Sequence, residues 1–250
     1  MFKKISSAIN VVDLIKDHRL NRCDIEKAQC KGCESNQDWS EECSHEYRIC
    51  EDTHMALTLA ATPLGNPLDA SPRLRAAIEN AEIIAAEDSR RFHRLASDIS
   101  ATFTAKILSF FEGNETDRTQ ELLIALRDGK NVVVVSDAGM PTISDPGFRL
   151  MRDAIAENIE VHVIPGPSAP TMAIALSGLP TDRFTFEGFA PRASGARIAF
   201  YESLRFEERT IVLFEAPHRL LESLSDAASI LGGTRRGAIC REMTKTYEET

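Results

Sequence analysis

The sequence lacks the long apolar segment that a membrane-spanning helix requires. No run of about 18 or more hydrophobic residues occurs in the chain, so we expect no transmembrane helix and no membrane partner. The first 20 residues are interrupted by Asp13, Lys16 and Asp17 and match a secretory signal poorly. We therefore expect a cytoplasmic protein.

The chain also lacks an excess of positive charge. It carries 29 Lys and Arg against 38 Asp and Glu, a formal net charge of −9. A protein that binds polyanions without specificity is normally basic, so any contact with nucleic acid must use local basic patches. Hydrophobic residues make up 43% of the 250 residues, which excludes a wholly disordered chain and leaves enough apolar material for a core.

Cysteine is scarce after position 54, where only Cys240 occurs, so the main body has no disulfide framework. Five cysteines crowd the leader, residues 1–54: Cys23, Cys30, Cys33, Cys43 and Cys50. Cys30 and Cys33 form one C-x-x-C knuckle, which could contribute to a zinc site, but a second knuckle at standard spacing is missing. We expect a poorly ordered Cys-rich leader and no metal.

Several standard catalytic motifs are missing from the body of the chain. It contains no G-x-G-x-x-G fingerprint, no P-loop, no H-E-x-x-H and no G-x-S-x-G. The usual signatures of dehydrogenases, kinases, metalloproteases and esterases are therefore absent.

From position 55 onward, short apolar runs alternate with helix signals. The expected strands are 57–61, 82–86, 106–109, 132–135, 161–164, 184–186, 210–214 and 237–240. The expected helices are 71–80, one from 89, 114–127, 146–157, 169–176, 196–206 and 218–231. This alternation predicts an α/β fold with a parallel, doubly wound sheet. We divide it into α/β domains at 55–165 and 166–250, the second incomplete at its C-terminal end because the chain stops just beyond a predicted strand.

Three Gly- and Pro-rich loops follow predicted strands, at residues 62–67, 136–147 and 165–169. In open α/β sheets, ligands bind beyond the carboxyl ends of the strands. Each loop alone is an ordinary turn, but three together favour one ligand site, where glycine lets the backbone approach a ligand closely.

Charged residues bunch near the same strand ends. Glu87 and Asp88 precede Arg90 and Arg91, which reads either as a helix start or as a carboxylate pair beside a basic patch. Further basic clusters include Arg192 with Arg197. Singly they are solvated faces, whereas gathered on one side they could neutralise RNA phosphates.

Seven blocks in order carry a family resemblance: ATPLGN (61–66), AEDSR (86–90), VSDAGMPTISDPG (135–147), PGPSA (165–169), GLPTDRFTFEGFAPR (178–192), FEAPHRL (214–220) and CREMTKTYEE (240–249). Together they closely resemble the ribosomal RNA small-subunit methyltransferase I family, which belongs to the tetrapyrrole-methylase-like (class III) S-adenosylmethionine enzymes. The resemblance covers about residues 57–250. Ser89 and Met140 stand where threonine is common in the family, and the family continues beyond the last block.

The resemblance implies two α/β domains of the tetrapyrrole methylase type, with the ligand cleft between them. It also implies methyl transfer from S-adenosyl-L-methionine to the ribose 2′-oxygen of a cytidine in 16S rRNA of the small ribosomal subunit, and a homodimer. The residues it places at the cofactor are Pro63, Gly65, Asn66, Asp137, Gly139, Pro141, Ser168 and Ala169.

A sulfonium donor carries its own activation, so the reaction needs alignment and a proton acceptor rather than a metal. The expected acceptors are Glu87, Asp88 and Glu187. The expected RNA contacts are Arg90, Arg91, Arg192, His218 and Arg219. Two alternatives stay open: a methylase of a tetrapyrrole precursor, and a truncated non-catalytic remnant that binds RNA or cofactor.

Overall fold

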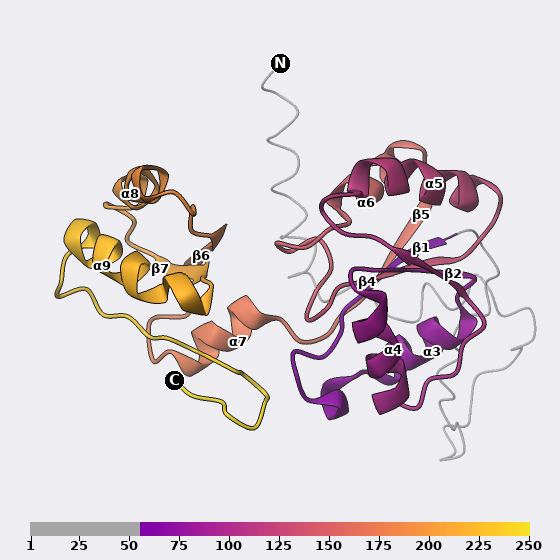
Figure 1. Ribbon diagram of the computed structural model, residues 1–250, viewed down its shortest axis with the longest axis horizontal. Coiled ribbons are helices and arrows are strands. Elements are labelled where there is room, and N and C mark those ends of the chain that lie inside the picture. Colours follow the sequence, from indigo (N-terminus) through magenta and orange to yellow (C-terminus); the bar gives the residue numbers. More distant parts are fainter. Residues whose placement is uncertain (1–55) are drawn as a thin grey trace, which may run out of the picture. The chain divides into compact units, whose positions relative to one another are not determined.

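The computed structural model describes residues 56–250, which carry the colour scale in Figure 1. The leader and its cysteines lie outside the described residues. A five-stranded parallel sheet has the order β3-β2-β4-β1-β5. Its strands are β1 (Ala56–Ala60), β2 (Ile83–Ala86), β3 (Lys106–Ser109), β4 (Val132–Val135) and β5 (Glu160–Ile164). The predicted α/β fold with a parallel sheet is confirmed.

The sheet is buried on both faces at its centre, where β4 lies between β2 and β1. All four valines of β4 are buried, as expected for a continuous β-branched run. Because side chains alternate along a strand, Val132 and Val134 join one core cluster and Val133 and Val135 join the other. Two apolar layers therefore require helices on both sides of the sheet.

Those helices follow from amphipathic segments with good starting residues. One core cluster includes side chains of α5 (Glu115–Arg127) and α6 (Phe148–Ala156), and the other includes those of α3 (Pro72–Asn80) and α4 (Ser89–Asp98). Figure 1 shows α5 and α6 on one side of the sheet and α3 and α4 on the other. Ser71 caps α3 through the bond from Leu74 N to its Oγ, 3.0 Å, as its N-cap position predicts.

A second, two-stranded parallel sheet pairs β6 (Phe184–Phe189) with β7 (Thr210–Phe214). It is accompanied by α7 (Ala169–Leu176), α8 (Ser194–Ser203) and α9 (Leu220–Leu231). The helices α8 and α9 are joined by a buried hydrogen bond between Tyr201 Oη and Ser223 Oγ, 2.6 Å. The division into domains at 165/166 stays a prediction.

The expected strand at 237–240 is wrong. These four residues form no helix and pair with no strand among the described residues, and only an isolated bridge between Arg241 and Glu249 follows. A run of apolar residues becomes a strand only where a neighbour satisfies its backbone groups. The helix expected from 218 begins as a 3₁₀ turn, η3 (Pro217–Arg219), and α6 begins after Gly147 rather than at Pro146.

The strand order creates a switch point between β1 and β4. The connection from β1 leads through α3 to β2, on one side of β4, whereas the connection from β4 leads through α6 to β5, on the far side of β1. The two helices cover opposite faces of the sheet. Ligands of open α/β sheets bind at such a point, outside the carboxyl ends of the strands.

Candidate functional site

The loops that follow β1 and β4 are bonded to each other. Thr62 and Gly139 exchange both backbone hydrogen bonds, with N–O distances of 2.8 and 3.1 Å. The buried Thr62 also donates its hydroxyl to Ser136 O, 3.2 Å away. These bonds hold the two loops together at the switch point.

The loop after β5 joins the same place. A Cβ on Gly139 would lie 3.3 Å from Leu64 Cδ2 and 3.7 Å from Pro167 O, one atom from each of the other two loops. A Cβ on Gly166 would lie only 2.8 Å from Ala61 Cβ, so glycine is needed for this close approach. The expected convergence of the three loops is confirmed, although their role in binding stays a prediction.

A pocket of about 90 Å³ opens at this convergence, which is well below the roughly 300–1,000 Å³ of typical ligand pockets. Its polar groups are few, Asp145 and Ser168, and the rest of its wall is backbone or apolar. Its lining residues are Ala138, Gly139, Met140, Ile143, Asp145, Ser168, Ala169, Pro170, Phe189 and Phe214. A carboxylate suits a sulfonium, and a serine hydroxyl and a glycine backbone can bond polar groups of a ligand, so the chemistry of these residues fits S-adenosylmethionine.

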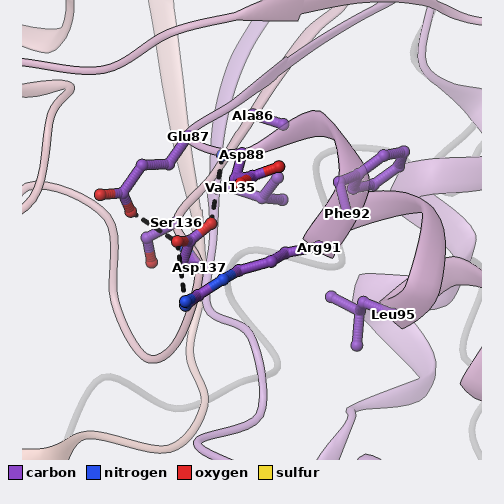
Figure 2. A pocket seen from close by; sticks show the side chains of 9 residues that line it. All are labelled: Ala86, Glu87, Asp88, Arg91, Phe92, Leu95, Val135, Ser136 and Asp137. Atoms are coloured by element: carbon purple, nitrogen blue, oxygen red, sulfur yellow. Dashed lines mark hydrogen bonds and ion pairs between the residues drawn. The ribbon is translucent and has the colours of Figure 1, made fainter.

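A second, smaller pocket of about 10 Å³, room for about one water molecule, lies beside the ends of β2 and β4, and Figure 2 shows its side chains. Asp137 is the centre of its polar network. Its backbone N donates to Glu87 Oε2 at 3.1 Å, and its Oδ1 accepts from Asp88 N at 3.1 Å. Its Oδ2 lies 3.1 Å from Arg91 Nη1. The structure thus brings four expected site residues into one network.

The pKa values of the carboxylates in this network are shifted in different directions. Burial, and then the charge of Asp137, raises the pKa of Glu87, although the backbone bond from Asp137 opposes the shift. Burial also raises the pKa of Asp137. Bonds from Arg90 hold the pKa of Asp88 well below its usual range, and Asp88 caps α4 through the bond from Arg90 N, 2.8 Å. A carboxylate held so firmly as an anion is a weak base.

Asp145 is a site residue that sequence reasoning missed. It lies in the loop 141–147 and lines the larger pocket. Burial, followed by the charge of Glu87, raises the pKa of Asp145 to about 7. The only signal in the sequence was its place in the Asp145-Pro146-Gly147 turn of the loop after β4, which says nothing of burial.

The raised pKa of Asp145 predicts a pH-dependent stability. The folded state holds the proton of Asp145 more tightly than the unfolded chain does, in which the pKa has its ordinary value of 3.8. The resulting contribution to the free energy of unfolding is therefore complete below pH 3.8 and is lost as pH rises through about 7. Allowing for solvent screening of a partly exposed group, we expect the free energy of unfolding of Asp145→Asn to exceed that of wild type by about 1–2 kcal/mol at pH 8. At low pH, where Asp145 is protonated, the two free energies should be equal. Urea denaturation across this range measures the difference. The exposed Asp182→Asn is the control, and a constant offset for Asp145→Asn would contradict the prediction.

The other expected residues are dispersed. Gly139, Ser168 and Ala169 line the larger pocket, whereas Pro63, Gly65, Asn66 and Pro141 line neither pocket. Asn66 N instead donates to Thr244 Oγ1 at 3.2 Å, and Gly65 packs against Lys245. The last sequence block of the resemblance, residues 240–249, therefore contacts the loop 62–67 that follows β1.

Glu187 and the expected RNA contacts also occupy different settings. Glu187 lies on β6 and accepts a hydrogen bond from Thr185 Oγ1. Arg90, Arg192 and His218 are exposed. Arg219 is only 13% exposed, because it pairs with Glu215 at 2.8 Å and donates to Ala190 O at 3.3 Å.

Arg197, which the sequence grouped with Arg192 on a basic face, is buried. Its side chain is 3% exposed and pairs with Asp226 at 2.7 Å, so it is not an RNA contact. Its Nη1 donates to Arg192 O at 3.2 Å. Arg197 therefore supports the loop that presents Arg192.

Within residues 56–250, no three His, Cys, Asp or Glu side chains are grouped as metal ligands require. In the same residues, no helix combines the length and apolarity needed to cross a membrane.

Two proteins named ribosomal RNA small subunit methyltransferase I match most of this chain. The ribosomal RNA small subunit methyltransferase I of Mycobacterium tuberculosis (strain ATCC 25618 / H37Rv) is 51% identical over 193 residues, which are 77% of this chain and 68% of that protein. The protein of the same name from Escherichia coli O157:H7 is 36% identical over 203 residues, 81% of this chain and 70% of its own length.

Solved structures agree at the level of fold. The methyltransferase CobJ superposes with a TM-score of 0.57 at 17% identity, over 78% of this chain and 83% of its own. The cobalt precorrin-4 methyltransferase CbiF superposes with a TM-score of 0.53 at 18% identity, over 72% and 77%. Residues 56–250 match the family of tetrapyrrole (corrin/porphyrin) methylases. The predicted methylase fold is thereby confirmed, and the chain belongs to the tetrapyrrole methylase family and, within it, to the ribosomal RNA small-subunit methyltransferase I family.

Proposed function

We propose that this chain transfers a methyl group from S-adenosylmethionine to the ribose 2′-oxygen of a cytidine in 16S rRNA of the small ribosomal subunit. The observation that carries the proposal is the convergence of three strand-end loops on one pocket, in a chain 51% identical to a relative that bears this family's name. The ribose and the cytidine come from the resemblance of the seven sequence blocks.

The pocket residues would hold the cofactor through polar contacts. The backbone of Gly139 and the start of α7, at Ser168 and Ala169, would contact its polar parts. When bound, S-adenosylmethionine supplies a methyl group on a positively charged sulfur. The chain contributes alignment and the carboxylate of Asp145, whose negative charge is opposite to that of the sulfonium.

Of the three expected proton acceptors, Glu87 has the most suitable environment. Its raised pKa keeps it a better base than Asp88, whose carboxylate already caps α4 and pairs with Arg90. Glu187 already accepts a hydrogen bond from the hydroxyl of Thr185 on β6.

RNA contact is assigned to the exposed arginines. Arg192 is exposed, and the buried Arg197 holds its backbone carbonyl. We expect Arg192→Gln to weaken binding of small-subunit RNA and to lower the slope of log affinity against log salt by about one unit, because one phosphate contact is lost. Filter binding at several salt concentrations measures both. Arg152→Gln, an exposed arginine paired with Asp153, is the matched control, and an unchanged slope for Arg192→Gln would remove it from the interface.

The function itself is tested in two steps. Calorimetry with S-adenosylmethionine asks whether the cofactor binds, and incubation with unmethylated small ribosomal subunits and labelled cofactor asks whether methyl groups reach the RNA. Mapping of the product locates the label on a ribose 2′-oxygen. Binding without transfer would favour the non-catalytic remnant, and label on the base would contradict the ribose assignment.

The tetrapyrrole alternative has weaker support. The structures named as corrin or porphyrin enzymes are 16–18% identical to this chain and share its fold alone. The chain aligns instead at 36–51% identity with proteins named for ribosomal RNA.

A further inference from the structure

We infer that Asp145 is the group that accepts the proton of the attacking hydroxyl, an inference that rests on the proposed function and adds a residue to its site. Asp145 is the one carboxylate among the residues that line the larger pocket. The same pocket contains Gly139 and Ser168 from two of the converged loops, where the donor would lie. A base must reach the reacting hydroxyl, so its place in this pocket comes first.

The aromatic part of the pocket wall, Phe189 and Phe214, fits a nucleotide that enters from solvent. Phe189 is 53% exposed and lies at a register shift in β6, next to Gly188 with φ of +66°. Its ring centroid is 5.3 Å from that of Phe214, and both rings line the pocket. Bulges re-aim side chains beside active sites, and exposed aromatic rings stack on the bases of single-stranded RNA. A base held there would present its ribose in the pocket that contains Asp145.

The loop that carries Asp145 is tied to this wall. A Cβ on Gly188 would lie 3.5 Å from Ser144 Oγ, so the loop 141–147 contacts the bulged part of β6. Asp145 and the aromatic pair thus line one pocket, and the residue before Asp145 contacts the strand that carries Phe189.

The charges around Asp145 tune it for this task. The groups that face it are Glu87 at the end of β2 and Asp137 at the end of β4, and Arg91 of α4 is paired with Asp137. No ion pair or hydrogen bond from a cation to Asp145 occurs within residues 56–250. With a pKa of about 7, Asp145 is a far stronger base than an ordinary aspartate and still loses its proton near neutral pH.

Glu87 is less well placed for the same step. It lines the smaller pocket, and its Oε2 accepts the backbone N–H of Asp137. Its negative charge acts instead by raising the pKa of Asp145. Glu87 is therefore a positioning and tuning residue in this assignment.

The step balances without a further reactant. The ribose 2′-oxygen forms a bond to the methyl carbon while the carbon–sulfur bond breaks, and that electron pair stays on sulfur. The hydroxyl proton passes to a carboxylate oxygen of Asp145, which later releases it to water. The products are the methyl ether, neutral S-adenosylhomocysteine and one proton.

The test compares wild type, Asp145→Asn and the exposed control Asp182→Asn on small ribosomal subunits between pH 5.5 and 8.5. We expect kcat/KM of the wild type to rise with pH and level off above about 7, since the deprotonated carboxylate is the active form. We expect Asp145→Asn to lower kcat by about 10²- to 10⁴-fold and to lose the rise. Asp182→Asn should behave as wild type.

A binding measurement provides a readout apart from turnover. The affinity of wild type for the cationic S-adenosylmethionine, relative to neutral S-adenosylhomocysteine, should increase as Asp145 ionises, and Asp145→Asn should lose this increase while still binding S-adenosylhomocysteine. A kcat within about threefold of wild type, or an unchanged pH rise in Asp145→Asn, overturns the inference alone. A wild-type enzyme that transfers no methyl group to the subunit overturns the proposed function and the inference with it.

Discussion

Replacement of Gly139 by valine is expected to weaken binding of S-adenosylmethionine by about 100-fold or more, equivalent to roughly 2.7 kcal/mol. Gly139 has φ of +84°, where a β-branched residue is strained, and its missing Cβ faces Leu64 and Pro167. Any side chain there must push the three loops apart or project into the pocket that they form. Titration calorimetry with the cofactor measures the loss.

Strain and obstruction can be separated with a matched glycine. Gly178 also has a positive φ, +65°, but a Cβ there would meet no atom within 4 Å. Gly178→Val therefore carries a similar backbone strain without touching the loops, and we expect it to bind the cofactor as wild type does. Equal affinity of wild type and Gly139→Val would refute the placement of the cofactor at these loops.

The second large effect is on stability. We expect Arg197→Ala to lower the free energy of unfolding by about 3 kcal/mol, because it leaves the partly buried Asp226 without its partner and removes a packed side chain. Arg197 bonds to Asp226 through Nε and Nη2, both at 2.7 Å, and this pair joins α8 to α9. Urea denaturation followed by circular dichroism gives the change.

Controls for Arg197 come from an exposed pair nearby in the sequence and from a double replacement. Arg205→Ala removes an arginine paired with Glu202 at 3.5 Å, and such exposed pairs change stability by about 0.5 kcal/mol or less. Arg197→Met combined with Asp226→Leu removes both charges together and should recover most of the loss. A loss below about 1 kcal/mol in Arg197→Ala would show that the pair contributes little.

Local signals were enough for most elements of the fold. The ranges of β3, β4, α7 and β7 coincide with those expected from the sequence, and Ser71 caps α3 as predicted. Each depends on a property of neighbouring residues: a β-branched run, a serine before a proline, or a stretch of apolar residues bounded by turns. The strand at 237–240 failed because a strand also needs a partner, which its own residues do not encode.

The sequence by itself determined the alternation of strands and helices, the loops at the strand ends and the family, because these are written in short, contiguous patterns. Only the tertiary structure decided that Asp145 lines the pocket and that Arg197 lies inside rather than on a basic face. The ionisation of a carboxylate depends on burial and on charges such as Glu87, which is 58 positions away in the chain. Such environments arise when distant segments pack together, and no local pattern of residue types specifies them.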